Sequence, residues 1–169
     1  MKNLSILAFL MVALFSCDKI TNVDFKQTST SADFVIKSGI QAVDYEDVIE
    51  LNYDLDAAAK SNGTSLDLLK EIKLVSGKAI AQTGNFDKWD NLSVTIMADG
   101  LADESMMTKM PVVTPTGSEL VMDVNTTTDF LPYLKGTNVK LKVKGKLKVA
   151  TTEDQTVNFE IGYNVKAGL

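Results

Sequence analysis

Apolar and polar residues alternate along much of this chain, a pattern typical of strands with one buried face and one wet face. Ile49, Leu51 and Tyr53 are separated by polar residues. The alternation is longest near the C-terminus, where 139–149 places lysines between apolar residues and 157–165 returns after a polar turn. We expect these two segments to form a long antiparallel hairpin.

The remaining segments extend the same all-β pattern. Further strands are predicted over 73–82, 93–98, 106–113 and 120–124, with the last two joined as a hairpin by a turn at 114–117. Three short helical segments are predicted. The first covers 56–60, the second begins at a capping box formed by Thr64, and the third covers 129–136. About eight strands with one to three short helices predict a two-layer antiparallel β-sandwich, immunoglobulin-like in type.

The first residues predict export and lipidation. Lys2 precedes an apolar run, 4–15, that is too short to span a membrane, and the only cysteine, Cys17, follows Ser16. The segment 14–17 resembles the bacterial lipobox, at which signal peptidases cut. We expect Cys17 to become the first mature residue and to carry acyl chains, since two or more chains anchor a protein stably.

These signals divide the chain into three parts. A lipoprotein signal peptide is expected over 1–16, and a lipidated cysteine with a tether and a first edge strand over 17–31. A single β-sandwich domain is expected over 32–169, a length that suits one hydrophobic core.

Missing residue types narrow the chemistry. The chain has no histidine and no arginine, so it lacks an imidazole base, an imidazole metal ligand and a bidentate clamp for phosphate. We therefore expect a protein that is not an enzyme and has no cofactor. A carboxylate-based hydrolase, which needs two facing acids in a cleft, is the remaining enzymatic alternative. The net charge of −5 argues against nucleic acid as a partner.

A row of alternating lysines is the first candidate binding surface. Its members lie on one face of one predicted strand: Lys140, Lys142, Lys144, Lys146 and Lys148. Such a stripe could contact lipid headgroups or acidic glycans. The preferred alternative is a solvated strand face that prevents edge-to-edge pairing, with Glu160 as a cross-strand partner. Gly145 interrupts the apolar residues that alternate with these lysines, and it predicts a bulge or the close approach of another backbone.

Aromatic residues form a second candidate site. Phe86, Trp89 and Leu92 are three residues apart, which predicts one turn of helix closing the end of the core. With Tyr133, the two rings Phe86 and Trp89 could also offer a stacking platform for a sugar. Burial over the end of the sandwich is the structural alternative and the preferred one.

Acidic residues form a third candidate site. Asp99, Asp103 and Glu104 gather in a predicted turn, and hard cations such as calcium take oxygen ligands from loops. The spacing matches no known calcium loop, so the alternative is an acidic loop in solvent and no metal. The run Asp44, Glu46, Asp47 and Glu50 is interpreted as a wet approach to a strand.

The order of these pieces resembles a family of small Bacteroidota lipoproteins that are predicted to be immunoglobulin-like sandwiches. The resemblance rests on the lipidated cysteine, on 53–55, 65–69, 93–101 and 129–134, and on the closing hairpin. It implies an outer-membrane lipoprotein and supplies no catalytic residues.

The expected function follows from the anchor and the fold class. We expect a non-enzymatic, lipid-anchored interaction module at the outer membrane, on its periplasmic or exposed side, acting as an accessory subunit or as an adhesin. An outer-membrane protein would be its partner and strand edges would make the contact. The alternative is a lipoprotein that binds lipid or glycan.

Overall fold

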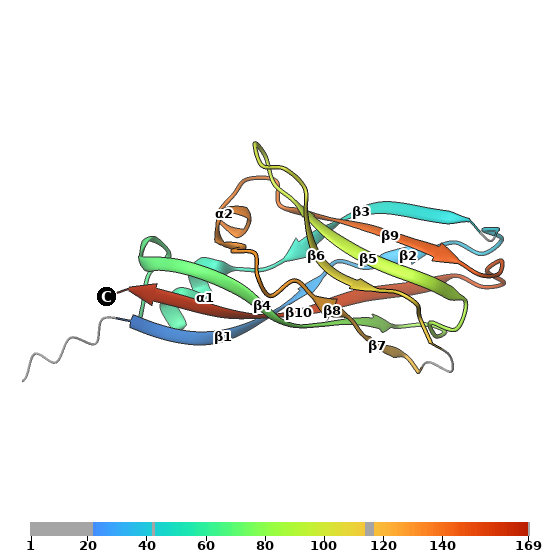
Figure 1. Cartoon of the computed structure of the whole chain (residues 1–169), viewed down its shortest axis with the longest axis horizontal. Helices are drawn as coiled ribbons and strands as arrows, with labels where there is room; N and C mark the ends of the chain where they lie inside the picture. The colour runs from blue at the N-terminus through green and yellow to red at the C-terminus, as the bar shows by residue number, and fades with distance from the viewer. Residues whose placement is uncertain (1–21, 42, 114–116, 169) are drawn as a thin grey trace, which may run out of the picture.

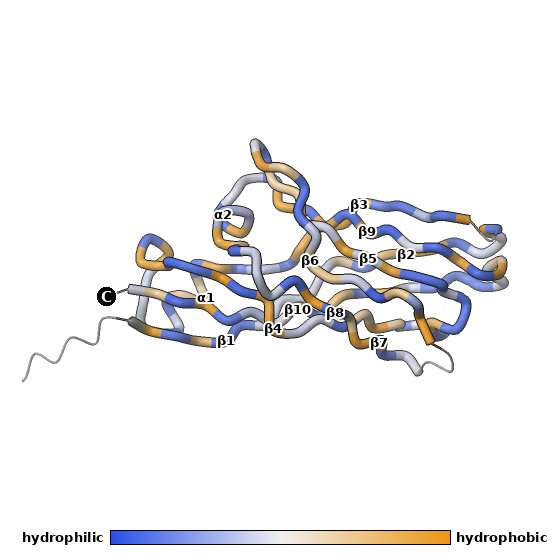
Figure 2. Tube along the Cα trace, viewed as in Figure 1, coloured by the Kyte–Doolittle hydropathy of each residue, from blue (hydrophilic) through white to orange (hydrophobic). Residues whose placement is uncertain are grey.

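Backbone pairing within residues 22–41, 43–113 and 117–168, which the computed structural model describes, arranges the chain as two antiparallel β layers (Figure 1). The all-β sandwich predicted from the alternation is therefore confirmed. The described residues form ten strands, two short α-helices and one 3₁₀ helix. Figure 2 shows hydrophobic and hydrophilic residues alternating along the strands, as one buried and one wet face require.

The first sheet is built around β10 (Gln155–Gly168). This strand of 14 residues pairs with β4 (Leu69–Ala81) on one side. On the other side it pairs with β1 (Asn22–Ser31) and then with β2 (Phe34–Ile36). The short β7 (Glu119–Val121) adds to the outer side of β4.

The second sheet has β9 (Lys140–Leu147) near its middle. Its neighbours are β3 (Asp44–Asn52) and β5 (Trp89–Met97), and β6 (Glu104–Lys109) and β8 (Asp123–Val124) follow beyond β5. Apart from the half-buried Met97, the apolar residues of β5 and β9 face the first sheet and are buried, while their polar residues face outward.

The two sheets meet at both long margins. On one margin β1 pairs with β3 at only two positions, Thr30 with Asn52 and Ser31 with Leu51. On the other margin the Met122 amide donates to the Gly77 carbonyl across 2.9 Å.

The short helices cover the part of the first sheet where β1 begins and β10 ends (Figure 1). In α1 (Leu55–Ser61) the Asp54 side chain accepts a hydrogen bond from the Ala57 amide, which caps the helix. The 3₁₀ helix η2 (Leu66–Leu68) follows, and α2 (Leu131–Leu134) packs its leucines into the same core.

The structure confirms some of the predicted helices and helix ends and contradicts one. The helix predicted at 56–60 is α1, one residue longer at each end, and Asn62 ends it as predicted. The helix predicted at 129–136 is α2, where the Asp129 carboxylate accepts from the Leu131 amide. The capping box at Thr64 was wrong, because η2 begins after Ser65 and no side chain caps it.

Of the two predicted hairpins, one was wrong and the other is confirmed only in part. Strands β9 and β10 lie in different sheets, so the connection between them crosses the sandwich instead of turning back within one layer. The hairpin predicted from 106–113 and 120–124 is confirmed where β6 pairs antiparallel with β8. It fails at β7, the first part of the second predicted strand, which pairs with β4 in the other sheet. The turn predicted at 114–117 lies outside the described residues except for Gly117.

The helical turn predicted from Phe86, Trp89 and Leu92 was also wrong. Trp89 begins β5, and the pairing of β5 with β9 shifts register between Trp89 and Asn91. Such an irregularity adds one residue to the strand, so Trp89 and Leu92 point to the same side although they are three apart. The spacing therefore imitates a helix.

Trp89 anchors the core between the sheets. Its ring lies 6.4 Å from that of Phe34, and its indole nitrogen donates to the buried Gln155 side chain across 3.0 Å. A Cβ added at Gly145 would lie 2.2 Å from a carbon of the indole. A close approach at Gly145 is therefore confirmed, but the nearest group is the Trp89 ring and not the backbone that was predicted; the Asn91 carbonyl oxygen lies farther away, at 3.0 Å from the added Cβ.

Replacing Gly145 by alanine is expected to lower the free energy of unfolding by about 1–3 kcal/mol, because the indole of Trp89 must move in a packed core. Urea denaturation followed by Trp89 fluorescence measures the change. Gly117→Ala is the matched control, since no heavy atom lies within 4 Å of an added Cβ there. Equal stability of Gly145→Ala and the control would contradict this packing.

Candidate functional site

The structure places the lysine stripe on the outer face of the second sheet. Because β9 pairs with β3 and β5, the stripe lies in the interior of a sheet and does not guard an edge. The register sets acidic residues of β3 directly opposite three of the lysines: Asp44 opposite Lys146, Glu46 opposite Lys144 and Glu50 opposite Lys140. We call this arrangement the charge ladder.

Several of these lysines have partners. Lys144 lies 2.7 Å from the Glu46 carboxylate, and Lys142 pairs with Asp103. The hydrogen bond with Asp103 raises the pKa of Lys142. Lys148 donates to the Val112 carbonyl across 3.1 Å. Opposed acids and partners thus balance much of the positive charge of the stripe, which leaves a mixed polar face.

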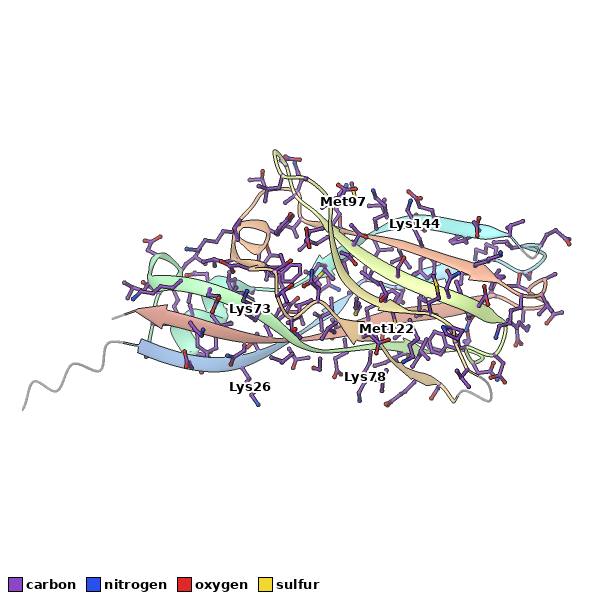
Figure 3. The ribbon with its side chains drawn as sticks, viewed as in Figure 1. Lys26, Lys73, Lys78, Met97, Met122 and Lys144 are labelled. Carbon is purple, nitrogen blue, oxygen red and sulfur yellow. The ribbon has the colours of Figure 1, made fainter. Side chains whose placement is uncertain are left out.

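Glu160 was a wrong assignment as the partner of the stripe. It lies on β10, in the first sheet, where it faces Thr30 and Lys78. Figure 3 shows Lys78 and Lys144 extending from opposite sides of the sandwich. The acidic run that was interpreted as a wet strand approach, Asp44 to Glu50, supplies the cross-strand partners instead.

The aromatic residues do not form a platform. Phe86 and Trp89 are 0% exposed, so neither ring has a face free for a sugar. Tyr133 lies in α2, where its ring packs against Phe130 and its hydroxyl donates to the Ala102 carbonyl across 2.8 Å. The burial predicted as the structural alternative describes Phe86 and Trp89.

The three acidic side chains of the 99–104 segment each bond to a different group of residues. Asp99 accepts from the Asn138 amide across 2.6 Å, and Asp103 pairs with Lys142. Glu104 accepts from Asn125 and Thr128. Across the described ranges, no group of three or more His, Cys, Asp or Glu side chains is arranged to hold a metal ion. These carboxylates therefore hold loops together.

Cys17, the predicted lipidation site, lies outside the described residues. The described chain begins at Asn22, the first residue of β1. Within the part of the chain that the structure describes, no helix has both the length and the apolar character needed to cross a membrane.

A groove beside β1 is the site that the sequence did not reveal. Its walls are β1, the segment that follows β3, and α1, and its volume is about 610 Å³. We call it the β1–α1 groove; its lining residues are Gln27, Thr28, Ser29, Thr30, Asn52, Tyr53, Asp54, Ala57, Ala58 and Ser61. Most are small or uncharged, so no charge or motif marks them in the sequence.

A small cavity adjoins this groove. The two share four lining residues, Gln27, Ser29, Tyr53 and Asp54. The cavity has a volume of about 10 Å³, and its inner wall is apolar, with Leu55, Ile72, Leu134 and Val165. A volume of this size holds about one water-sized group.

Tyr163 brings an unpaired polar group to this cavity. Its side chain is 3% exposed and lines the cavity, and its hydroxyl has no hydrogen-bond partner of normal geometry. Burial raises the pKa of Tyr163, and the neighbouring Ser29 hydroxyl opposes that rise. A hydrogen-bonding group of a ligand that entered the cavity would lie within reach of this hydroxyl.

Comparison with known proteins adds no family. The chain matches no protein-family model and no curated protein. Among solved structures, a chain titled Desmodium yellow mottle tymovirus is similar at a TM-score of 0.30, with 13% identity over 88% of each chain. A similarity this low carries no argument. The fold and site define an all-β sandwich with a groove at a strand edge.

The charge ladder yields a measurable coupling. In a double-mutant cycle of Glu46→Gln and Lys144→Gln, we expect a coupling of about 0.2–1 kcal/mol in the free energy of unfolding, typical of exposed ion pairs. The coupling should shrink in about 1 M NaCl, where the Debye length is about 3 Å. A cycle of Glu46→Gln with Lys140→Gln is the control, since Lys140 faces Glu50. Equal coupling in both cycles would refute direct pairing.

Proposed function

We propose that this chain is a lipid-anchored, non-enzymatic interaction module of the bacterial outer membrane that binds a partner through the β1–α1 groove. The observation that carries the proposal is the groove itself. It has room for a segment of another molecule, and it lies directly beside the strand edge of β1.

The position of the anchor supports this proposal. Cys17 precedes Asn22 by five residues. Since an extended chain spans at most about 3.6 Å per residue, the lipid and the start of β1 are within roughly 18 Å of each other. Asn22 pairs with Gly168, so this end of the sandwich would face the membrane and the opposite loops would face away (Figure 1).

The groove lining supports binding over catalysis. Asp54 is the only carboxylate among the groove's lining residues, and it already accepts the Ala57 amide as the α1 cap. A carboxylate-based hydrolase needs two acids that face each other across a cleft. The sequence contains neither histidine nor arginine, and this also favours binding over catalysis.

The rival proposal, a lipid- or glycan-binding lipoprotein, has less support. Phe86 and Trp89 have no exposed face for a sugar. The cavity beside the groove has a volume of about 10 Å³, which suits one small group and not an acyl chain.

Acylation of Cys17 can be tested by removing its thiol. Cys17→Ser removes the thiol that would be acylated, so we expect the variant to lose incorporation of labelled fatty acid and to leave the membrane fraction of cells. Ser16→Ala is the matched control, because alanine keeps a small residue before Cys17. If wild-type protein takes up no label and stays soluble, the anchor is refuted.

The second prediction concerns binding. Wild-type protein extracted from native membranes in mild detergent should elute with a second polypeptide at a fixed ratio, as measured by light scattering. Elution as a monomer in every mild detergent would contradict the proposed module.

A further inference from the structure

Strand β1 is hydrogen-bonded as a sheet strand on one side only along most of its length. It pairs with β10 from Asn22 to Thr30. On its other side, in the described ranges, only Thr30 and Ser31 pair with β3. The stretch from Val23 to Ser29 is therefore a free edge, and its last part lines the β1–α1 groove.

The neighbouring hydrogen bonds fix which backbone groups of β1 point to this free edge. The Phe159 amide donates toward β1, to the Ser31 side chain, while the Thr156 carbonyl accepts from Gln82 on the β4 side. Odd-numbered residues of β10 therefore bond toward β1 in this stretch. Since backbone directions alternate along a strand, their odd-numbered partners in β1 bond to β10.

The even-numbered residues of β1 consequently direct their amide and carbonyl groups to the free edge. These are Asp24, Lys26 and Thr28, and the Ala32 amide continues the series by donating to the Glu50 carbonyl of β3. The Thr28 carbonyl accepts only a 3.2 Å contact from the adjacent Gln27 side chain, among the described residues. The edge thus offers backbone donors and acceptors at the spacing of a strand.

We propose that the partner binds by adding an extended peptide segment as a strand to this edge of β1. The inference rests on the proposed binding function and specifies its chemistry. The segment would bond to the backbone of Lys26 and Thr28 and lie between β1 and α1, where Ala57 and Ala58 leave room. Strand addition takes affinity from the backbone and specificity from pockets for alternate side chains.

The small cavity is such a pocket. Ser29 and Gln27 point inward from β1 and line the cavity with Tyr163. A side chain of the added segment that faces inward beside Ser29 would reach this wall. Because the Tyr163 hydroxyl is buried beside the Ser29 hydroxyl and the cavity holds about one water-sized group, the cavity favours a small uncharged group that can form a hydrogen bond, such as the hydroxyl of a serine.

The geometry favours a single peptide segment over a second copy of this chain. In a second copy, β1 is bonded to β10, so pairing of two β1 edges would bring a whole sheet into the space beside α1. Lys26 extends outward from β1 (Figure 3), and an edge lysine is a common device against pairing of like edges.

The test uses the full-length lipoprotein in detergent micelles and a displayed library of random linear peptides. Thr28→Pro removes the backbone donor at the free edge and leaves the bonds to β10 in place, whereas Thr28→Ala changes the side chain alone. We expect selected peptides to bind wild type and Thr28→Ala equally and to bind Thr28→Pro at least about tenfold more weakly. Unchanged melting of Thr28→Pro confirms its folding.

A second readout needs no variant. In the wild-type complex, the amides of Lys26 and Thr28 should gain protection from hydrogen exchange when the peptide binds. Three results would overturn strand addition: no enriched peptide, equal binding to Thr28→Pro, or no added protection. A wild-type dimer that Thr28→Pro dissociates would assign the edge to a second copy and overturn the choice of a peptide.

The outcome is separable from that of the proposed function. If a native partner still co-purifies from membranes with both wild type and Thr28→Pro, the binding module stands and strand addition fails. If no partner co-purifies with wild type, the proposed function fails first.

Discussion

The pairing of β10 on both of its sides is the constraint on which the rest of the structure depends. This strand holds β4 along one side and β1, then β2, along the other. The backbone amides and carbonyls of the odd-numbered residues of β1 bond to β10. Because β1 pairs with β3 at only two positions, the side of β1 that faces away from β10 is otherwise unpaired in the described residues. The free edge beside α1 thus follows from the topology and does not depend on any special residue.

Charge plays a smaller part in this molecule than its lysine-rich strand suggests. The ladder between β3 and β9 pairs acids with lysines on a solvated face, where each pair contributes little to stability. Stability comes instead from the apolar layer between the sheets, in which Trp89, Phe34 and Phe159 are fully buried. The free edge of β1 is therefore a better candidate for a binding surface than the charge ladder between β3 and β9.

The sequence predicted the local structure well and the pairing poorly. Alternation marked the strands, and Asn62 and Asp129 marked the end of α1 and the start of α2, because these signals act within a few residues. Which strands become neighbours depends on long-range contacts, so β9 and β10 looked like a hairpin although they lie in opposite sheets. The sequence did not predict the β1–α1 groove for the same reason. Its walls come from segments that are separated in the sequence, and its lining residues form no recognisable motif.

Residue-resolved amide exchange of the full-length protein, without peptide, tests the open edge most directly. The open edge predicts an alternation: the amides of Phe25, Gln27 and Ser29 exchange slowly because they bond to β10, and those of Asp24, Lys26 and Thr28 exchange quickly. Slow exchange at all six positions would contradict it, since it would mean that another strand already covers this edge of β1.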